Sequence, residues 1–238
     1  GTDPDADRVG VVVKNLEGDY TILSGNMSGA LLTEYVLSQK KEKGEFPNNA
    51  AVVKTIVTTE MIKPIAEEYG AKVFDVLTGF KYIGEKIKEF EETNEYTYLF
   101  GFEESYGCLA GTYARDKDAV VATMLICELA AVYKKRGITL FDGLMELYEK
   151  YGFYKEGVKS ITLKGIDGVR KIGEIMDSFR QNPPTMLCGK RIEWVRDYKK
   201  AEFSNILTGE KQENKLPKSN VLHYTIEDGS WFCVRPSG

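Results

Sequence analysis

Between Gly29 and about Gly137, segments with helical spacing of apolar residues alternate with short apolar runs, and this alternation restricts the fold more than any other feature. The runs expected as strands are 50–57, 72–77 and 96–100. The expected helices are 31–43, 83–90 and 118–136, with a short helix ended by Gly70, and the last of the three is rich in Ala, Leu and Val and is expected to be buried. Strands that alternate with helices pair in parallel, because each helix carries the chain back across the sheet. The sequence therefore predicts an α/β domain with a mixed, mostly parallel sheet and crossover helices.

The pattern changes after a further helix expected at 140–148. A strand is expected at 158–163 and an amphipathic helix at 166–179. Short apolar runs then follow, separated by turn signals such as Thr208-Gly209 and Asp228-Gly229. They cover 191–195, 203–207, 221–226 and 231–234. This part predicts a smaller α+β domain with an antiparallel sheet, beginning near residues 151–157.

Composition excludes several classes of protein. The net charge is −4, from 32 basic and 36 acidic residues, and no basic cluster is present. This balance argues against a nucleic-acid or membrane partner, and no apolar run reaches membrane length. The four scattered cysteines and the single histidine exclude a Cys/His zinc site and indicate a reduced, cytoplasmic protein.

Three aspartates stand at alternate positions near the start of the chain, at Asp3, Asp5 and Asp7. In an extended loop these side chains project to one side, and three carboxylates crowd together only around a cation. Oxygen ligands favour Mg²⁺, Mn²⁺ or Ca²⁺ over zinc. A calcium-binding EF-hand is excluded, because the positions that need glycine and glutamate hold Arg8 and Lys14. The loop is a candidate metal site, and the alternative is a solvated acidic segment.

Other candidate residues follow the expected strands, where ligands bind in an open parallel sheet. Lys54 interrupts an apolar strand, and Lys81 stands between two aromatic residues just before a helix. The loop 101–107 holds Glu103 and Ser105 between flanking glycines. A carboxylate matches the vicinal hydroxyls of a sugar, because it accepts two hydrogen bonds. Each feature also fits an ordinary surface lysine or a polar turn.

The sequence ends with Arg235, Pro236, Ser237 and Gly238, directly after an expected strand. A guanidinium binds phosphate through two hydrogen bonds, serine adds a hydroxyl, and a glycine N–H can complete an anion nest. Such a segment alone does not predict a phosphate site, but its occurrence after the other three loops, in this order, is a specific pattern. Because candidate functional loops stand at both ends, we expect the chain to be a fragment of a longer polypeptide.

These four loops resemble those of the α-D-phosphohexomutase superfamily, and most closely its bacterial phosphoglucomutase branch. The matching segments are 3–8, 78–81, 101–107 and 235–238. Family members have four domains around a central cleft. The resemblance implies that residues 1–17 are the tail of the second domain, 18–150 the third, and 151–238 a truncated fourth. The first domain, which carries a phosphorylated catalytic serine, would be missing, so the chain alone is expected to be inactive.

The resemblance also implies a mechanism. A phosphoserine donates its phosphoryl group to a hexose monophosphate, giving a bisphosphate that turns over in the cleft and returns the other phosphate. Asp3, Asp5 and Asp7 would hold Mg²⁺, which offsets charge on the transferring group. The implied catalytic residues are Arg8, beside the phosphoryl group, and Lys81 and Lys54, in proton transfer or charge stabilisation.

For the substrate, the resemblance implies that Glu103 and Ser105 bind the 3- and 4-hydroxyls of the sugar. The other implied substrate-binding residues are Gly79 and the phosphate-binding Arg235, Ser237 and Gly238. The family's aminosugar branch has a histidine in the sugar loop where this chain has Gly107. Glucose 1-phosphate, glucose 6-phosphate and glucose 1,6-bisphosphate are therefore the expected ligands.

Three alternatives remain. One is a phosphomannomutase. Another is a metal-dependent phosphatase with an aspartate nucleophile, although such enzymes place the strand before the aspartates and here it follows them. The third is a sugar-phosphate binding module without catalysis, because the chain contains no candidate nucleophile.

Overall fold

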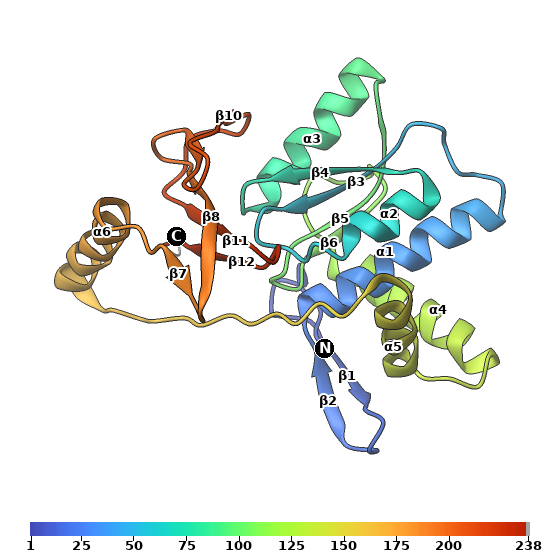
Figure 1. Cartoon of the computed structure of the whole chain (residues 1–238). Helices are drawn as coiled ribbons and strands as arrows, with labels where there is room; N and C mark the ends of the chain where they lie inside the picture. The colour runs from blue at the N-terminus through green and yellow to red at the C-terminus, as the bar shows by residue number, and fades with distance from the viewer. Residues whose placement is uncertain (237–238) are drawn as a thin grey trace. The chain divides into compact units, whose positions relative to one another are not determined.

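The computed structural model describes residues 1–236, and the chain divides into two units, Gly1–Glu156 and Gly157–Gly238. The first unit is built on a four-stranded sheet in the order β4-β3-β5-β6 (Figure 1). Its strands are β3 (Ala50–Thr55), β4 (Lys72–Val76), β5 (Thr97–Phe102) and β6 (Cys108–Ala110). β3 runs parallel to β4 and β5, whereas β6 runs antiparallel to β5. The predicted α/β domain with a mixed, mostly parallel sheet is confirmed.

Helices cover both faces of this sheet, which explains why every residue of β3 is buried. Because successive side chains of a strand point to opposite faces, Ala50 and Val52 join one apolar cluster and Ala51 and Val53 join another. The helices α1 (Gly25–Glu42), α2 (Ile62–Tyr69), α4 (Ala119–Lys135) and α5 (Leu140–Tyr151) contribute to the first cluster, and α3 (Phe80–Thr93) contributes to the second.

Local signals set where these helices begin. The hydroxyl of Ser24 accepts a hydrogen bond from the amide of Met27 at 3.2 Å and starts α1. α3 begins at Phe80, three residues earlier than expected, with Gly79 at its N-cap in a positive-φ conformation (φ 113°). Lys81 therefore lies on the first turn of α3 rather than in a loop.

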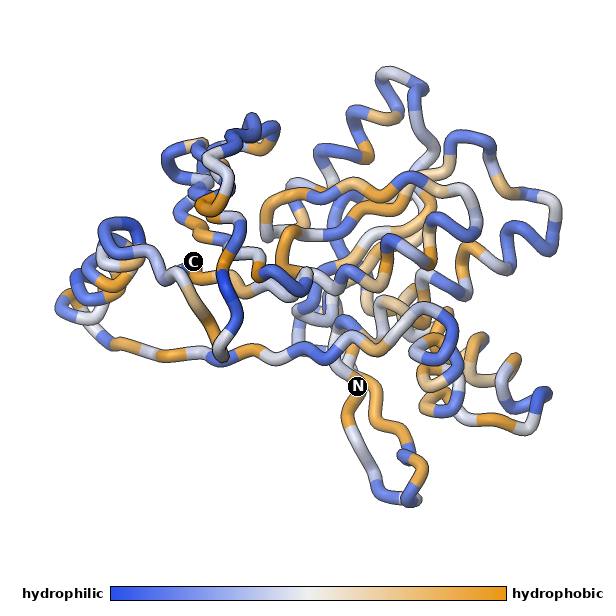
Figure 2. Tube along the Cα trace, viewed as in Figure 1, coloured by the Kyte–Doolittle hydropathy of each residue, from blue (hydrophilic) through white to orange (hydrophobic). Residues whose placement is uncertain are grey.

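A β-hairpin precedes α1. It consists of β1 (Val11–Lys14) and β2 (Tyr20–Leu23). The apolar run 9–13 after the three aspartates predicts the first of these strands, and the second was not expected. Val13 and Leu23 are buried, whereas Val12 and Ile22 are exposed on the opposite face. Figure 2 shows hydrophobic residues along both strands.

The second unit is an antiparallel sheet in the order β10-β9-β8-β11-β12, with β7 paired to β8. Its elements are α6 (Gly165–Gln181), β7 (Met186–Leu187), β8 (Lys190–Asp197), β9 (Glu202–Asn205), β10 (Lys211–Glu213), β11 (Leu222–Ile226) and β12 (Trp231–Val234). Met176 of α6 packs with Ile192, Tyr224 and Ile226 of the sheet. This confirms the expected α+β domain.

Two local expectations are wrong. The segment 158–163 forms no strand, although its residues alternate as a strand would. Val158 and Ile161 are largely exposed, and no strand of residues 1–236 pairs with this segment. α4 is not buried all round, because Val120 and Met124 are 60% and 65% exposed. Among the described residues, no helix has the length and apolar composition needed to cross a bilayer.

Candidate functional site

Three loops of the first unit meet at one edge of the sheet, because β3, β4 and β5 run in parallel and end there. The carboxylate of Glu103, in the loop after β5, accepts a hydrogen bond from the amide of Gly79, in the loop after β4, at 2.8 Å. The carboxylate of Glu104 accepts one from the hydroxyl of Thr55, at the end of β3, at 3.2 Å. The structure therefore joins segments that the sequence analysis singled out separately.

The loop 103–107, called the sugar loop below, is a tight connection between β5 and β6. The amide of Glu103 donates to the carbonyl of Gly107 at 2.9 Å, and Tyr106 adopts a positive φ of 74°. Glu103 is only 7% exposed, and Ser105 is half-buried. Burial raises the pKa of the Glu103 carboxyl above its ordinary value, and the hydrogen bond from Gly79 opposes this only in part.

The sugar loop packs closely on the start of α1. A Cβ atom at Gly25 would lie 2.1 Å from the carbonyl oxygen of Glu104 and 2.7 Å from the amide nitrogen of Tyr106. Both contacts involve backbone, which cannot move aside cheaply. Gly25 is therefore required for the present position of the loop.

The residues 3–8, called the Asp loop below, bring Asp3, Asp5 and Asp7 together. One carboxylate oxygen from each lies within 4.8 Å of the others. Asp3 Oδ1 accepts hydrogen bonds from the amides of Asp7 at 3.2 Å and Arg8 at 3.1 Å. Removal of water from around the carboxyl would raise the pKa of Asp3, but hydrogen bonds from Arg8 and Asp7 hold it below its usual value.

Asp7 gives a direct test of whether this loop suits a metal ion. Its Oδ1 atom is buried without a hydrogen-bond partner in the described part of the chain, and Arg8 Nε lies 3.6 Å away. A buried carboxylate oxygen without a donor is costly unless a ligand completes it. Three converging carboxylates with one such oxygen fit a hard divalent cation such as Mg²⁺.

Backbone contacts tie the Asp loop to the sugar loop. Arg8 forms a β-bridge with Gly107, and the amide of Val9 donates to the carbonyl of Tyr106 at 3.3 Å. The amide of Ala119 donates to the carbonyl of Ala6 at 3.1 Å. The candidate metal residues and the candidate sugar residues therefore belong to one site.

Lys117 belongs to this site, although the sequence analysis missed it. Its ammonium lies 2.9 Å from Asp7 Oδ2 and 5.9 Å from the centre of the Phe80 ring. Its stem fills the space beside Gly107, where a Cβ atom would come within 2.3 Å of the Lys117 side chain. Burial would lower the pKa of Lys117, but Asp7 and Asp116 raise it above the ordinary value. In the sequence, Lys117 stands in the charged run 115–118, which is typical of a solvated linker and therefore does not indicate a site.

The two lysines proposed as catalytic lie in different environments. Lys81 is exposed, and its ammonium lies 4.9 Å from the centre of the Tyr82 ring. Lys54 has no exposed surface, and its ammonium lies 2.6 Å from Asp75 Oδ1. Lys81 is therefore accessible to a ligand, whereas Lys54 is part of the interior.

The phosphate-binding residues expected at the end of the chain belong to the second unit. Arg235 is exposed directly after β12. Ser237 and Gly238 lie outside the described residues. The geometry above is therefore that of the first unit alone.

Comparisons with known proteins point to one family. The family model for phosphoglucomutase/phosphomannomutase, alpha/beta/alpha domain III, matches residues 24–151. A phosphoglucomutase from Staphylococcus aureus (strain USA300) is 35% identical over 237 residues, covering 100% of this chain and 42% of that protein. A crystal structure of a phosphoglucomutase/phosphomannomutase family protein from Burkholderia thailandensis shares the fold, with a TM-score of 0.52 and 18% identity, covering 80% of this chain and 36% of that chain. This chain thus spans about two fifths of the length of the S. aureus relative.

Proposed function

Because this chain belongs to the phosphoglucomutase/phosphomannomutase family, we propose that it is part of a cytoplasmic enzyme that interconverts hexose 1-phosphate and hexose 6-phosphate, with glucose preferred. The observation that carries the proposal is the joining of the Asp loop and the sugar loop into one site through Arg8, Gly107 and Lys117. Identity of 35% to a phosphoglucomutase over the whole chain supports the choice of reaction.

In this proposal Asp3, Asp5 and Asp7 hold Mg²⁺. The ion, when bound, offsets negative charge on the phosphoryl group during transfer. Lys117 pairs with the Oδ2 atom of Asp7, and Oδ1, which has no hydrogen bond among the described residues, is the oxygen that would serve as the metal ligand. Arg8, at the end of the loop, stabilises the phosphoryl oxygens.

Glu103 and Ser105 bind the sugar hydroxyls. The hydrogen bond from Gly79 fixes one carboxylate oxygen of Glu103, so its other oxygen is oriented to accept from a hydroxyl. Gly79 thus acts on the substrate by orienting Glu103. Lys81, accessible on the first turn of α3, is the residue we assign to proton transfer or charge stabilisation.

The phosphoryl donor in this proposal is a phosphoserine in the part of the longer protein that this chain does not include, and glucose 1,6-bisphosphate is the intermediate. Arg235, Ser237 and Gly238 grip the phosphate that is not reacting. The chain alone then binds sugar phosphate without converting it.

The test is a titration of the chain with glucose 1-phosphate, followed by amide NMR shifts. We expect weak binding, with the largest shifts at residues 79 and 103–107, because two hydroxyl contacts contribute only about 1–3 kcal/mol. Glu103→Gln should abolish the shifts, whereas Glu92→Gln, an exposed position near the end of α3, should leave them unchanged. Shifts centred elsewhere, or unchanged binding by Glu103→Gln, would contradict the sugar-loop assignment.

The second candidate is a phosphomannomutase, which the matched family includes by its description, and the same titration with mannose 1-phosphate measures how far this unit distinguishes the two sugars. The two sugars differ at the 2-hydroxyl, whereas the proposed contacts are to the 3- and 4-hydroxyls. We therefore expect mannose 1-phosphate to bind as well, and glucose preference to be modest in this unit.

A further inference from the structure

Lys54 lies at the carboxyl end of β3, with 0% of its side chain exposed. Its ammonium lies 2.6 Å from Asp75 Oδ1 and donates to Glu60 Oε1 at 2.9 Å. It also donates to the carbonyls of Thr58 at 3.3 Å and Thr55 at 3.4 Å. A buried ammonium needs such partners, because removing its charge from water is costly. Lys54 is therefore an ion of the protein interior, enclosed by oxygens.

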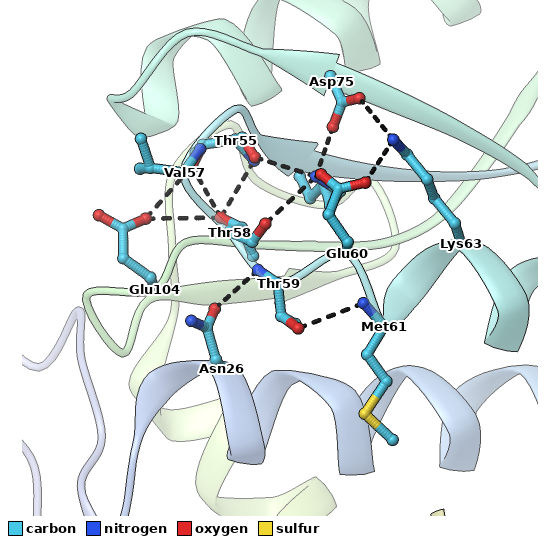
Figure 3. A network of polar contacts seen from close by, with 11 residues as sticks. Asn26, Thr55, Val57, Thr58, Thr59, Glu60, Met61, Lys63, Asp75 and Glu104 are labelled. Carbon is cyan, nitrogen blue, oxygen red and sulfur yellow. Dashed lines mark hydrogen bonds and ion pairs between the residues drawn. The ribbon is translucent and has the colours of Figure 1, made fainter. Parts of the chain in front are cut away.

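A second lysine shares the two carboxylates that surround Lys54. The Lys63 ammonium contacts Glu60 Oε2 and lies 3.8 Å from Asp75 Oδ2, so two ammoniums face two carboxylates. Figure 3 shows Lys63 reaching both carboxylates. Burial would raise the pKa of Glu60, but Lys54 and Lys63 hold it below the ordinary value.

The carbonyls that Lys54 contacts belong to a turn at the end of β3. In this turn the amide of Thr58 donates to the carbonyl of Thr55 at 3.1 Å, and the two hydroxyls lie 2.7 Å apart. Both threonines are fully buried. The Lys54 ammonium therefore holds the two ends of this turn together from inside the fold.

The same two hydroxyls reach the sugar loop. Glu104 Oε2 lies 3.2 Å from Thr55 Oγ1 and 3.5 Å from Thr58 Oγ1. Figure 3 shows the Glu104 carboxylate facing these two threonines. Glu104 stands between the proposed sugar residues Glu103 and Ser105. A displacement of the turn would move Glu104 and, through the short loop backbone, its two neighbours.

We propose that Lys54 is a positioning residue of the sugar loop, acting through the turn 55–58 and Glu104. This inference rests on the proposed function for the meaning of the loop, but its structural part does not. A proton-transfer role needs contact with the substrate, and the ammonium of Lys54 is enclosed. In this proposal the two lysines have different roles: Lys81 contacts the ligand, and Lys54 positions the loop that binds it.

Two variants test the chain of contacts. Thr58→Val keeps Lys54 and every charge but removes one hydroxyl beside Glu104. The double variant Lys54→Met with Asp75→Asn removes the buried ion pair as a unit and leaves Glu60 paired with Lys63. The control is Thr33→Val, because Thr33 is equally buried but its hydroxyl donates to its own helix, at Gly29.

The first readout is amide hydrogen exchange in the chain without ligand. The Gly79 amide donates to Glu103, so its protection reports the position of the sugar loop. We expect about a tenfold loss of protection at Gly79 in both variants, with the amides of β5 unchanged and no effect of Thr33→Val. Unchanged protection at Gly79, or an equal loss throughout β5, would overturn the inference, since the second result is that of a general loss of stability.

The second readout is activity in the longer protein, with glucose 1-phosphate as substrate. Positioning predicts a KM raised several-fold in both variants and an unchanged pH profile of kcat. Loss of one limb of the pH profile in the lysine variant, but not in Thr58→Val, would make Lys54 catalytic and overturn the inference. If the unaltered chain binds no sugar phosphate, the proposed function fails, while the exchange result still decides whether Lys54 positions the loop.

Discussion

The Asp loop and the sugar loop lie in one site, but the fold prepares their carboxylates differently. Glu103 and Glu104 are supplied with donors by the chain itself, from Gly79, Thr55 and Thr58. In the Asp loop, Asp5 is exposed and Asp7 keeps a buried oxygen without a hydrogen bond among the described residues. The sugar loop is therefore held by donors from neighbouring strands and loops, whereas one oxygen of Asp7 in the Asp loop has no such donor within residues 1–236. Under the proposed function, this difference suits hydroxyl binding in the first loop and cation binding in the second.

The largest effect is expected on catalysis by the longer protein. Asp5→Asn should lower turnover of glucose 1-phosphate at least about a hundredfold, because a metal ion supplies several kcal/mol of charge stabilisation in the transition state. Asp19→Asn, in the exposed turn before β2, is the matched control. Unchanged turnover by Asp5→Asn at limiting Mg²⁺ would remove the Asp loop from the account.

Gly25→Ala should displace the sugar loop. The added Cβ would meet the backbone of Glu104, so we expect about 1–3 kcal/mol lower stability in urea unfolding. Gly173→Ala, at a helical position with open space, should instead stabilise the protein by about 0.5–1 kcal/mol. Equal effects of the two substitutions would mean that the close approach at Gly25 is relieved without cost.

Lys117→Met should act on the Asp loop. Asp7 would lose its partner at Oδ2, and a partly buried carboxylate without a donor costs about 1–3 kcal/mol. Urea unfolding measures the loss, and Lys88→Met, an exposed lysine of α3, is the control. Adding Mg²⁺ should restore part of the lost stability, because the cation takes over neutralisation of Asp7. A variant as stable as the parent chain without Mg²⁺ would contradict this role.

The sequence predicted the parallel sheet and the Asp loop, because periodicity and the spacing of like charges are local properties. It also placed Glu103 and Ser105 in one loop. It could not show that Lys54 is buried and Lys81 exposed, since the partners that allow a buried Lys54 are Asp75 on the neighbouring strand and Glu60 beyond the turn. Lys117 was missed for a similar reason: its partner Asp7 lies far away in the chain.

The smallest expected effect on stability depends on pH and comes from the ionisation of Glu103. The pKa of Glu103 is raised in the folded state, so between its ordinary and its raised value the folded protein binds more protons than the unfolded chain. Stability from this group therefore falls as the pH rises through that interval. Glu103→Gln should gain in stability relative to the parent chain as the pH rises over the same interval, as measured by thermal unfolding. A constant difference between the two proteins from pH 4 to pH 7 would contradict the raised pKa.

The most direct test of the contrast between the two loops is amide exchange with and without Mg²⁺. The Gly79 amide reports the sugar loop, and the amides of Asp7 and Arg8, which donate to Asp3, report the Asp loop. We expect the Gly79 amide to be protected in the absence of any ligand and unchanged by Mg²⁺, whereas protection of the Asp7 and Arg8 amides should rise several-fold. Protection that rises equally in both loops, or an Asp loop that does not respond to Mg²⁺, would contradict this expectation.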